Sequence, residues 1–101
     1  MSSAKVKPRA DDLGFDVERI REDFPILHTR VNGKPLVFLD NAASSQMPQA
    51  VIDRYVRYRS SEHANIHRGV HHLSEVATRE YEAVRGRVRA WINAAEEREI
   101  V

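Results

Sequence analysis

Two short stretches of the sequence contain side chains that could do chemistry. The first, NIHRGVHH at residues 65–72, holds three of the chain's five histidines, one arginine and a glycine. A histidine can transfer a proton or stack on a ring, and a neighbouring arginine can bind an anion. Gly69 would let another group approach the backbone closely. These residue types fit a functional loop, and they also fit an ordinary solvated surface.

A metal site is another interpretation of the same histidines. His63, His67 and His71 recur every four residues, so on one continuous helix they would share a face and could bind zinc or nickel. Asn65 and Gly69 weaken such a helix, and the chain has no cysteine to complete the ligand set. We therefore expect no metal site and keep a histidine-rich metal binder only as a third hypothesis.

The second stretch, LDNAASSQMP at residues 39–48, follows the apolar run at residues 36–39, which predicts a short buried strand. In open α/β sheets, ligands bind at the carboxyl ends of strands. Asn41 offers an amide there, and the small side chains of Ala42 and Ala43 leave room for a ligand. An ordinary polar loop between a strand and a helix is the alternative.

The first half of the chain is expected to position the second stretch with one helix and one turn. A helix is predicted over residues 16–24, because Asp16 is a good N-cap and Pro25 disfavours helical geometry in the residue before it. The pair Asn32-Gly33 predicts a turn ahead of the apolar run, since both residue types accept a positive φ.

The second half is expected to be helical on both sides of the histidine loop. Pro48 fits the first turn of an amphipathic helix over residues 48–63. A sustained apolar stripe predicts a long helix over residues 73–94, with Ser74 as its cap. Gly86 is a misfit inside that helix and predicts that a neighbouring backbone packs closely there.

Composition excludes several classes of function. The 101 residues include 16 basic and 15 acidic side chains, a net charge of +1, which is unlike a nucleic-acid binder. No apolar run approaches the roughly 20 residues of a membrane span, and no signal peptide is recognisable. We expect a cytoplasmic chain with a disordered tail over residues 1–15. The ending Ile100-Val101 reads like the start of a strand, so we expect a longer protein.

Three stretches together resemble one enzyme family. They are FPIL…VNGKPLVFLDNAASSQMPQAVID, NIHRGVHHLSEVAT and YEAVRGRVRAWINA. Their order and spacing resemble SUF-type cysteine desulfurases, which are pyridoxal-phosphate (PLP) enzymes of the class V aminotransferase group. The resemblance covers about residues 17–101. It implies an α/β fold in which residues 16–101 are the truncated N-terminal segment of a type I PLP-dependent transferase domain, mostly helical with a short strand or hairpin.

The resemblance also implies a reaction and a set of partners. Such an enzyme converts L-cysteine to L-alanine and leaves a persulfide on the enzyme for iron–sulfur cluster assembly. It would be a homodimer that contains PLP and passes sulfur to an acceptor protein. The substrate-side loop would match Asn41, Ala42 and Ala43. The HRG loop near the substrate and the dimer partner would match His67 and Arg68.

The chain departs from the family at the reacting groups themselves. The reaction needs a lysine that holds PLP and a cysteine thiolate that accepts sulfur. The chain has no cysteine, and none of its three lysines follows a histidine as the family's PLP lysine does. No catalytic residue is therefore assigned, and the chain alone is expected to be inactive and to expose apolar surface. The alternatives are a non-catalytic remnant or interaction module, and a selenocysteine lyase or another class V enzyme.

Overall fold

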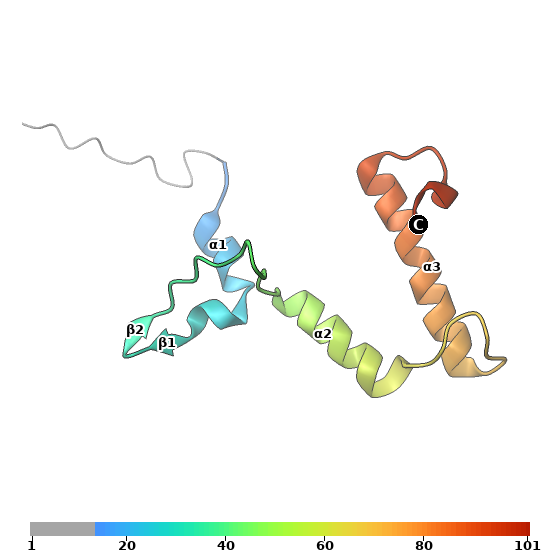
Figure 1. The fold of residues 1–101 in the computed structure, drawn as a ribbon, viewed down its shortest axis with the longest axis horizontal. Coiled ribbons are helices and arrows are strands. Elements are labelled where there is room, and N and C mark those ends of the chain that lie inside the picture. Colours follow the sequence, from blue (N-terminus) through green and yellow to red (C-terminus); the bar gives the residue numbers. More distant parts are fainter. Residues whose placement is uncertain (1–13) are drawn as a thin grey trace, which may run out of the picture. The chain divides into compact units, whose positions relative to one another are not determined.

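The computed structural model describes residues 14–101, so the expected tail lies almost entirely outside the described residues. The chain divides into two units, of which the first ends at Asp53 and the second spans Arg54–Val101. Helices dominate both units, and the described residues contain one two-stranded antiparallel sheet (Figure 1). The expectation of a mostly helical piece with a short hairpin is confirmed. Among residues 14–101, no helix has the length and apolar character that crossing a bilayer requires.

The first helix, α1 (Val17–Glu22), forms where its cap predicts it. The Asp16 carboxylate accepts a hydrogen bond of 3.0 Å from the backbone N–H of Arg19, which satisfies one of the free donors of the first turn. The helix stops before Pro25, which opens the 3-10 helix η2 (Pro25–His28). Both the cap and the stop are confirmed.

The hairpin of the first unit consists of β1 (Arg30–Val31) and β2 (Lys34–Pro35). Arg30 pairs with Pro35 and Val31 with Lys34. The two residues between the strands both have a positive φ, 49° at Asn32 and 74° at Gly33. This geometry is that of a tight hairpin turn, so the turn prediction is confirmed.

The predicted buried strand at residues 36–39 is wrong. The backbone N–H of Leu36 still bonds to the carbonyl of Thr29, but no strand continues beyond it. Val37 and Leu39 are 75% and 89% exposed. A strand needs a hydrogen-bonded partner along at least one edge, and among the described residues no strand pairs with this run.

The helix α2 (Gln49–Arg57) begins directly after Pro48, whose carbonyl accepts the first helical hydrogen bonds from Val51 and Ile52. It ends earlier than predicted and widens into one π-helical turn, η3 (Tyr58–Glu62). The hydroxyls of Ser60 and Ser61 bond back to the carbonyls of Val56 and Arg57. Serine hydroxyls compete with backbone N–H groups for such carbonyls, which explains the wider turn.

The long helix α3 (His72–Ile92) is confirmed, but its predicted cap is wrong. The N-cap is His71, whose Nδ1 atom accepts a hydrogen bond from the backbone N–H of Ser74. At the other end Asn93 takes the left-handed conformation, with a φ of 58°, that commonly closes a helix. Ser74 lies inside the first turn of the helix, where its side chain has a different role, described below.

The expected exposure of apolar surface is confirmed. Among the described residues only Ala77 and Ser74 count as buried, with 4% and 1% of their surface exposed. Trp91, at the far end of the apolar stripe of α3, is 87% exposed. A stripe of this kind normally packs against another layer of structure. Among the described residues, a large part of the apolar stripe of α3 has no such packing partner.

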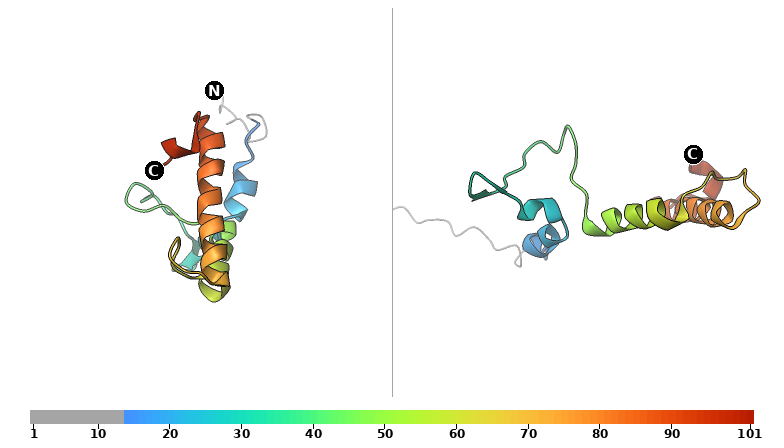
Figure 2. Two further views of the ribbon diagram at one scale, coloured as in Figure 1. Left: turned by 90° about the vertical axis from the view of Figure 1, so that its right-hand side faces the viewer. Right: turned by 90° about the horizontal axis from the view of Figure 1, so that it is seen from below.

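The glycine in α3 does face a neighbouring segment, although a side chain rather than a backbone approaches it. After Asn93 the chain turns back beside the last turns of α3 and forms the 3-10 helix η4 (Glu97–Glu99) (Figure 2). A Cβ atom on Gly86 would lie 3.2 Å from the Glu97 carboxylate. Arg89 holds the returning segment by two hydrogen bonds to the carbonyl of Ala95.

Candidate functional site

The loop that contains the HRG stretch joins η3 to α3 and has an unusual backbone at its centre. His67 adopts a φ of 63°, a left-handed conformation that costs free energy in a residue with a side chain. The backbone N–H of His67 donates a 3.0 Å hydrogen bond to the hydroxyl of Thr78, on the second turn of α3. This bond links the strained residue to a rigid helix and so helps to hold it in place.

A buried serine closes the same loop on both sides of His67. The Ser74 hydroxyl donates to the carbonyl of Asn65 at 2.8 Å and accepts from the backbone N–H of Gly69 at 3.1 Å. Gly69 lies so near that a Cβ atom on it would be 2.5 Å from Ser74 Cβ and 2.9 Å from Nε2 of His71. A side chain at residue 69 would clash, because the chain's own Ser74 and His71 side chains occupy the space beside Gly69; the approach of a ligand at this position stays a prediction.

The side chain of His67 is also held by α3. Its Nε2 atom lies 2.7 Å from Oε1 of Glu82, and its ring meets the ring of Tyr81 edge to face with 5.9 Å between centroids. The imidazole remains half exposed. The ring is therefore oriented by two neighbours while one side stays open to solvent.

Three polar residues of α3 thus fix the loop, and sequence reasoning missed all three. Ser74, Thr78 and Glu82 are spaced by four residues, which places them on one face of a helix. Ser74 was predicted to be a cap, and neither Thr78 nor Glu82 was singled out. The only signal in the sequence was their spacing. Residues with hydrogen-bonding side chains recur every four positions beside the apolar stripe of an amphipathic helix.

Of the other polar residues of the histidine region, two have separate hydrogen-bond partners and Arg68 faces solvent. Arg68 is exposed. His63 forms a 2.9 Å hydrogen bond with the hydroxyl of Tyr58, and His71 caps α3. His63, His67 and His71 therefore do not lie on one helix, which removes the premise of the metal interpretation. Among residues 14–101, no group of three or more histidine, aspartate or glutamate side chains is arranged to hold a metal ion.

An ion-pair cluster joins the end of α2 to the π turn in the second unit. The Glu62 carboxylate, only 18% exposed, lies 2.8 Å from the guanidinium of Arg54 and 3.0 Å from that of Arg57. Nearby, Arg59 donates a hydrogen bond to the hydroxyl of Tyr55, which raises the pKa of the Arg59 guanidinium. That group is charged at any physiological pH, so the raised pKa has no functional consequence.

In the first unit, Asn41, Ala42 and Ala43 form a tight turn directly after the exposed apolar run. The carbonyl of Asp40 accepts hydrogen bonds from the backbone N–H groups of Ala43 and Ser44. The Ser45 hydroxyl lies 3.5 Å from the carbonyl of Asn41. All three candidate residues are exposed, so their backbone and small side chains are accessible to a ligand.

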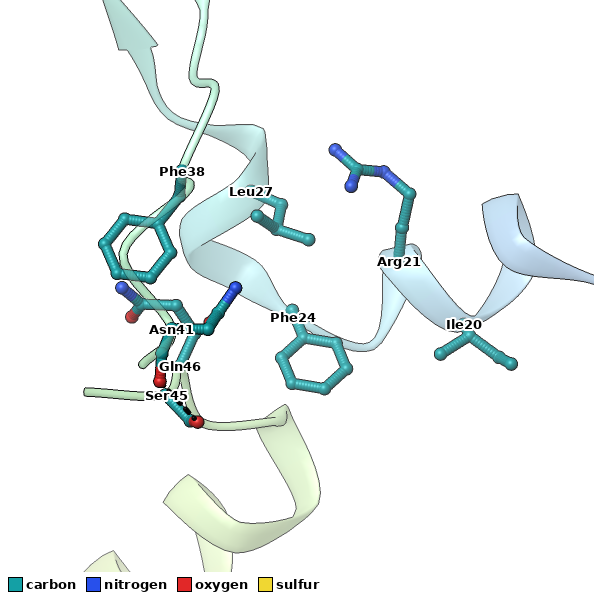
Figure 3. A pocket seen from close by; sticks show the side chains of 8 residues that line it. All are labelled: Ile20, Arg21, Phe24, Leu27, Phe38, Asn41, Ser45 and Gln46. Carbon is teal, nitrogen blue, oxygen red and sulfur yellow. Dashed lines mark hydrogen bonds between the residues drawn. The ribbon is translucent and has the colours of Figure 1, made fainter. Parts of the chain in front are cut away.

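Asn41 also lines a pocket of about 400 Å³ in this unit (Figure 3). Phe24 and Leu27 line it from the α1–η2 side, and Phe38 from the apolar run. The remaining lining residues are Ile20, Arg21, Ser45 and Gln46. The lining thus combines four apolar side chains with two amides, one hydroxyl and one guanidinium.

The structure places the candidate site residues in two groups. Asn41, Ala42 and Ala43 belong to the first unit, and His67 and Arg68 to the second. Each group stands on a loop that adjoins the start of a helix, and each presents polar groups at its surface. Neither loop holds a lysine or a cysteine.

Comparison with known proteins identifies similar chains. The family described as aminotransferase class-V matches residues 37–101. The chain is 52% identical over 92 residues to a cysteine desulfurase of Synechococcus elongatus, covering 91% of this chain and 15% of that protein. It is 55% identical over 82 residues to a probable cysteine desulfurase of a Synechocystis species, covering 81% of this chain and 20% of that protein.

A solved structure is similar as well. The apo structure of a cysteine desulfurase from Thermococcus onnurineus NA1 superposes with a TM-score of 0.69 at 36% sequence identity, covering 84% of this chain and 20% of that one. The chain thus spans only about a fifth of the length of the relatives it matches.

Proposed function

Because the chain belongs to the class-V aminotransferase family, we propose that it forms the substrate-side wall of a PLP-dependent cysteine desulfurase. Its similarity to cysteine desulfurases over 81–91% of its length is the observation that supports the proposal most directly. The geometry is consistent with this role: one loop presents Asn41 beside small residues, and another presents His67 beside an exposed arginine.

The proposed reaction moves one sulfur atom. The bond between Cβ and sulfur of L-cysteine breaks, the sulfur joins an enzyme thiol as a persulfide, and the substrate carbon skeleton leaves as L-alanine. Cysteine plus a thiol gives alanine plus a persulfide, so atoms and electrons balance without an external oxidant or reductant. PLP supplies an electron sink for the substrate carbon atoms when it is bound.

The residues of this chain would bind and orient the substrate. Arg68 is exposed and suited to pair with a carboxylate, which it can hold by two parallel hydrogen bonds. The Asn41 amide can donate and accept hydrogen bonds, and Ala42 and Ala43 leave room for the substrate beside the backbone. The His67 imidazole can accept or return a proton.

The residues present do not fit the group that anchors PLP. The one lysine among residues 14–101 is Lys34, on the exposed strand β2 of the hairpin, away from both candidate loops in sequence. We therefore assign no cofactor ligand to this chain and derive no step through the cofactor. The lysine and the thiol that the reaction needs would come from polypeptide corresponding to the part of the relatives that this chain does not span.

Further parts of the proposal follow from the family rather than from the geometry. The complete enzyme would be a cytoplasmic homodimer, and it would pass its persulfide sulfur to an acceptor protein of iron–sulfur cluster assembly. The exposed apolar residues, such as Val37, Leu39 and Trp91, are compatible with burial against other polypeptide in that assembly.

A chimeric enzyme tests the proposal. The matching N-terminal region of the Serratia proteamaculans cysteine desulfurase, 52% identical over 89 residues, is replaced by this chain. We expect the chimera to form L-alanine from L-cysteine with PLP bound, and we expect Arg68→Ala to raise the KM for L-cysteine by roughly 10-fold or more, the loss of one charge-assisted contact. Alanine is measured after quenching by chromatography.

The 101-residue chain with PLP and L-cysteine is the matched control, and it is expected to form no alanine. A chimera that folds and binds PLP but makes no alanine would contradict the proposed role. Selenocysteine as the substrate, measured in parallel, distinguishes a desulfurase from a selenocysteine lyase by the ratio of the two kcat/KM values.

A further inference from the structure

We propose that Glu82 is a positioning residue that holds the His67 imidazole by its Nε2–H group and leaves Nδ1 as the nitrogen available to the substrate. The inference rests on the proposed function, because it assigns a part of the same site. Glu82 matches no element of the motifs that define the two candidate loops, and it lies fifteen residues beyond His67.

The contact geometry carries the inference. Nε2 of His67 lies 2.7 Å from Oε1 of Glu82, a short distance for an N–H···O bond and typical of one to a charged acceptor. The His67 backbone N–H is bound to Thr78, one turn before Glu82 on the same helix. Main chain and side chain are therefore held by one rigid element, which is how a reacting group keeps its orientation.

The hydrogen bond to Glu82 determines which ring nitrogen of His67 carries the proton. An ionised carboxylate can only accept a hydrogen bond, so Nε2 must carry the proton. A neutral imidazole has one N–H group, and Nδ1 then presents a lone pair. Within the part of the chain that the structure describes, Nδ1 of His67 has no hydrogen-bond partner, and the side chain is half exposed.

This arrangement suits proton transfer. When Nδ1 takes a proton from an S–H or N–H group of L-cysteine, the electron pair stays on the substrate atom and the ring becomes an imidazolium. The Glu82 carboxylate stabilises that positive charge, in the way an aspartate orients and stabilises the histidine of a hydrolase triad. The second oxygen of Glu82 lies 3.6 Å from the Arg85 guanidinium, which keeps the carboxylate directed along α3.

The first test observes the ring directly in the 101-residue chain. Histidine is labelled with ¹⁵N, and the ring nitrogens of His67 are read by long-range proton–nitrogen correlation at about pH 8, where an ordinary histidine is neutral. We expect a single tautomer with the proton on Nε2 and a lone pair on Nδ1. Glu82→Ala should shift both nitrogens, Glu82→Gln should largely preserve them, and Glu75→Ala, on the exposed side of the same helix, should leave them unchanged.

The second test measures turnover in the chimera described above. Glu82→Ala should lower kcat roughly 10-fold with little change in KM, because the ring loses its orientation but the binding residues remain. Glu82→Gln should recover part of that loss, since its amide oxygen still accepts a hydrogen bond. Circular dichroism confirms that each variant keeps its helix content.

The outcomes separate the two proposals. If the chemical shifts of the His67 ring nitrogens do not change in Glu82→Ala, the positioning role is overturned. It is also overturned if those shifts change but kcat of the Glu82→Ala chimera does not. An inactive parent chimera would count against the proposed function, while the ring measurement would still decide whether Glu82 holds His67.

Discussion

Gly69 and Ser74 lie so close together that a Cβ atom on Gly69 would come within 2.5 Å of Ser74 Cβ. Real Cβ atoms do not approach a neighbour this closely, so the loop and the first turn of α3 can meet only through a glycine. The Ser74 hydroxyl uses the same proximity to bond the backbone on both sides of His67.

Gly69→Ala is expected to displace the loop and to lower the free energy of unfolding by about 1–3 kcal/mol, the usual cost of overpacking. The free energy of unfolding is measured by urea denaturation, with circular dichroism as the signal. Gly86→Ala is the matched control on α3, where a Cβ meets only the flexible end of Glu97. That change should leave stability equal or raise it by up to about 1 kcal/mol, since alanine favours a helix over glycine. Equal losses in both variants would contradict the steric explanation.

Ser74→Ala removes the bonds that hold the loop. The side chain is 1% exposed, so the carbonyl of Asn65 and the N–H of Gly69 lose a buried partner that water does not easily replace. We expect a loss of about 1–3 kcal/mol in the free energy of unfolding. Ser44→Ala, at an exposed serine of the first unit, should change it by less than about 0.5 kcal/mol. Faster hydrogen exchange at Gly69 in Ser74→Ala would locate the effect in the loop.

Glu62→Gln tests the ion-pair cluster. The Glu62 carboxylate lies between two guanidinium groups with little solvent around it, so its charge is expected to contribute about 1 kcal/mol to stability at low salt. The difference between parent and variant should shrink in about 1 M NaCl, because salt screens charge pairs. Glu75→Gln, without such partners, should show no comparable salt dependence. A Glu62 effect that is the same at both salt concentrations would mean that packing, not charge, is lost.

Trp91→Gln addresses the uncovered surface of α3. Since Trp91 is 87% exposed, its removal should leave the free energy of unfolding within about 0.5 kcal/mol. It should also reduce self-association of the chain, measured by sedimentation velocity, because a large exposed apolar side chain favours association. A clear loss of stability would show that Trp91 packs on the chain in solution.

Zinc titration by calorimetry tests the histidines directly. His63, His67 and His71 have separate partners, namely Tyr58, Glu82 and the N–H of Ser74. We expect no tight one-to-one uptake of zinc by the chain. Tight binding that disappears in His67→Ala would restore the metal interpretation and would show that the loop rearranges around an ion.

The sequence predicted the local elements well where one residue type decides the geometry. The cap at Asp16, the stop at Pro25 and the turn at Asn32-Gly33 each depend on a few neighbouring atoms, and each is found as predicted. The run at residues 36–39 failed because a strand depends on distant partners, which an apolar pattern cannot supply.

The candidate site was predictable only in part for a similar reason. Gly69 stood out because it lies between polar residues, but the sequence did not show that Ser74 is the group beside it. Ser74 was taken for a cap and Glu82 was not singled out, because these residue types are usual at caps and on exposed helix faces. Their partners lie in a loop whose path no pattern specifies. Their common spacing with Thr78 becomes meaningful only once His67 is known to lie beside that face.

The bonds from Ser74, Thr78 and Glu82 reach back no further than Asn65. The segment from Asn65 to Glu82 therefore contains both the turn and all three of its anchors, with every partner nearby along the chain. Contacts of such short sequence separation close quickly during folding. The contacts that shape the loop can therefore form while later residues are still being synthesised.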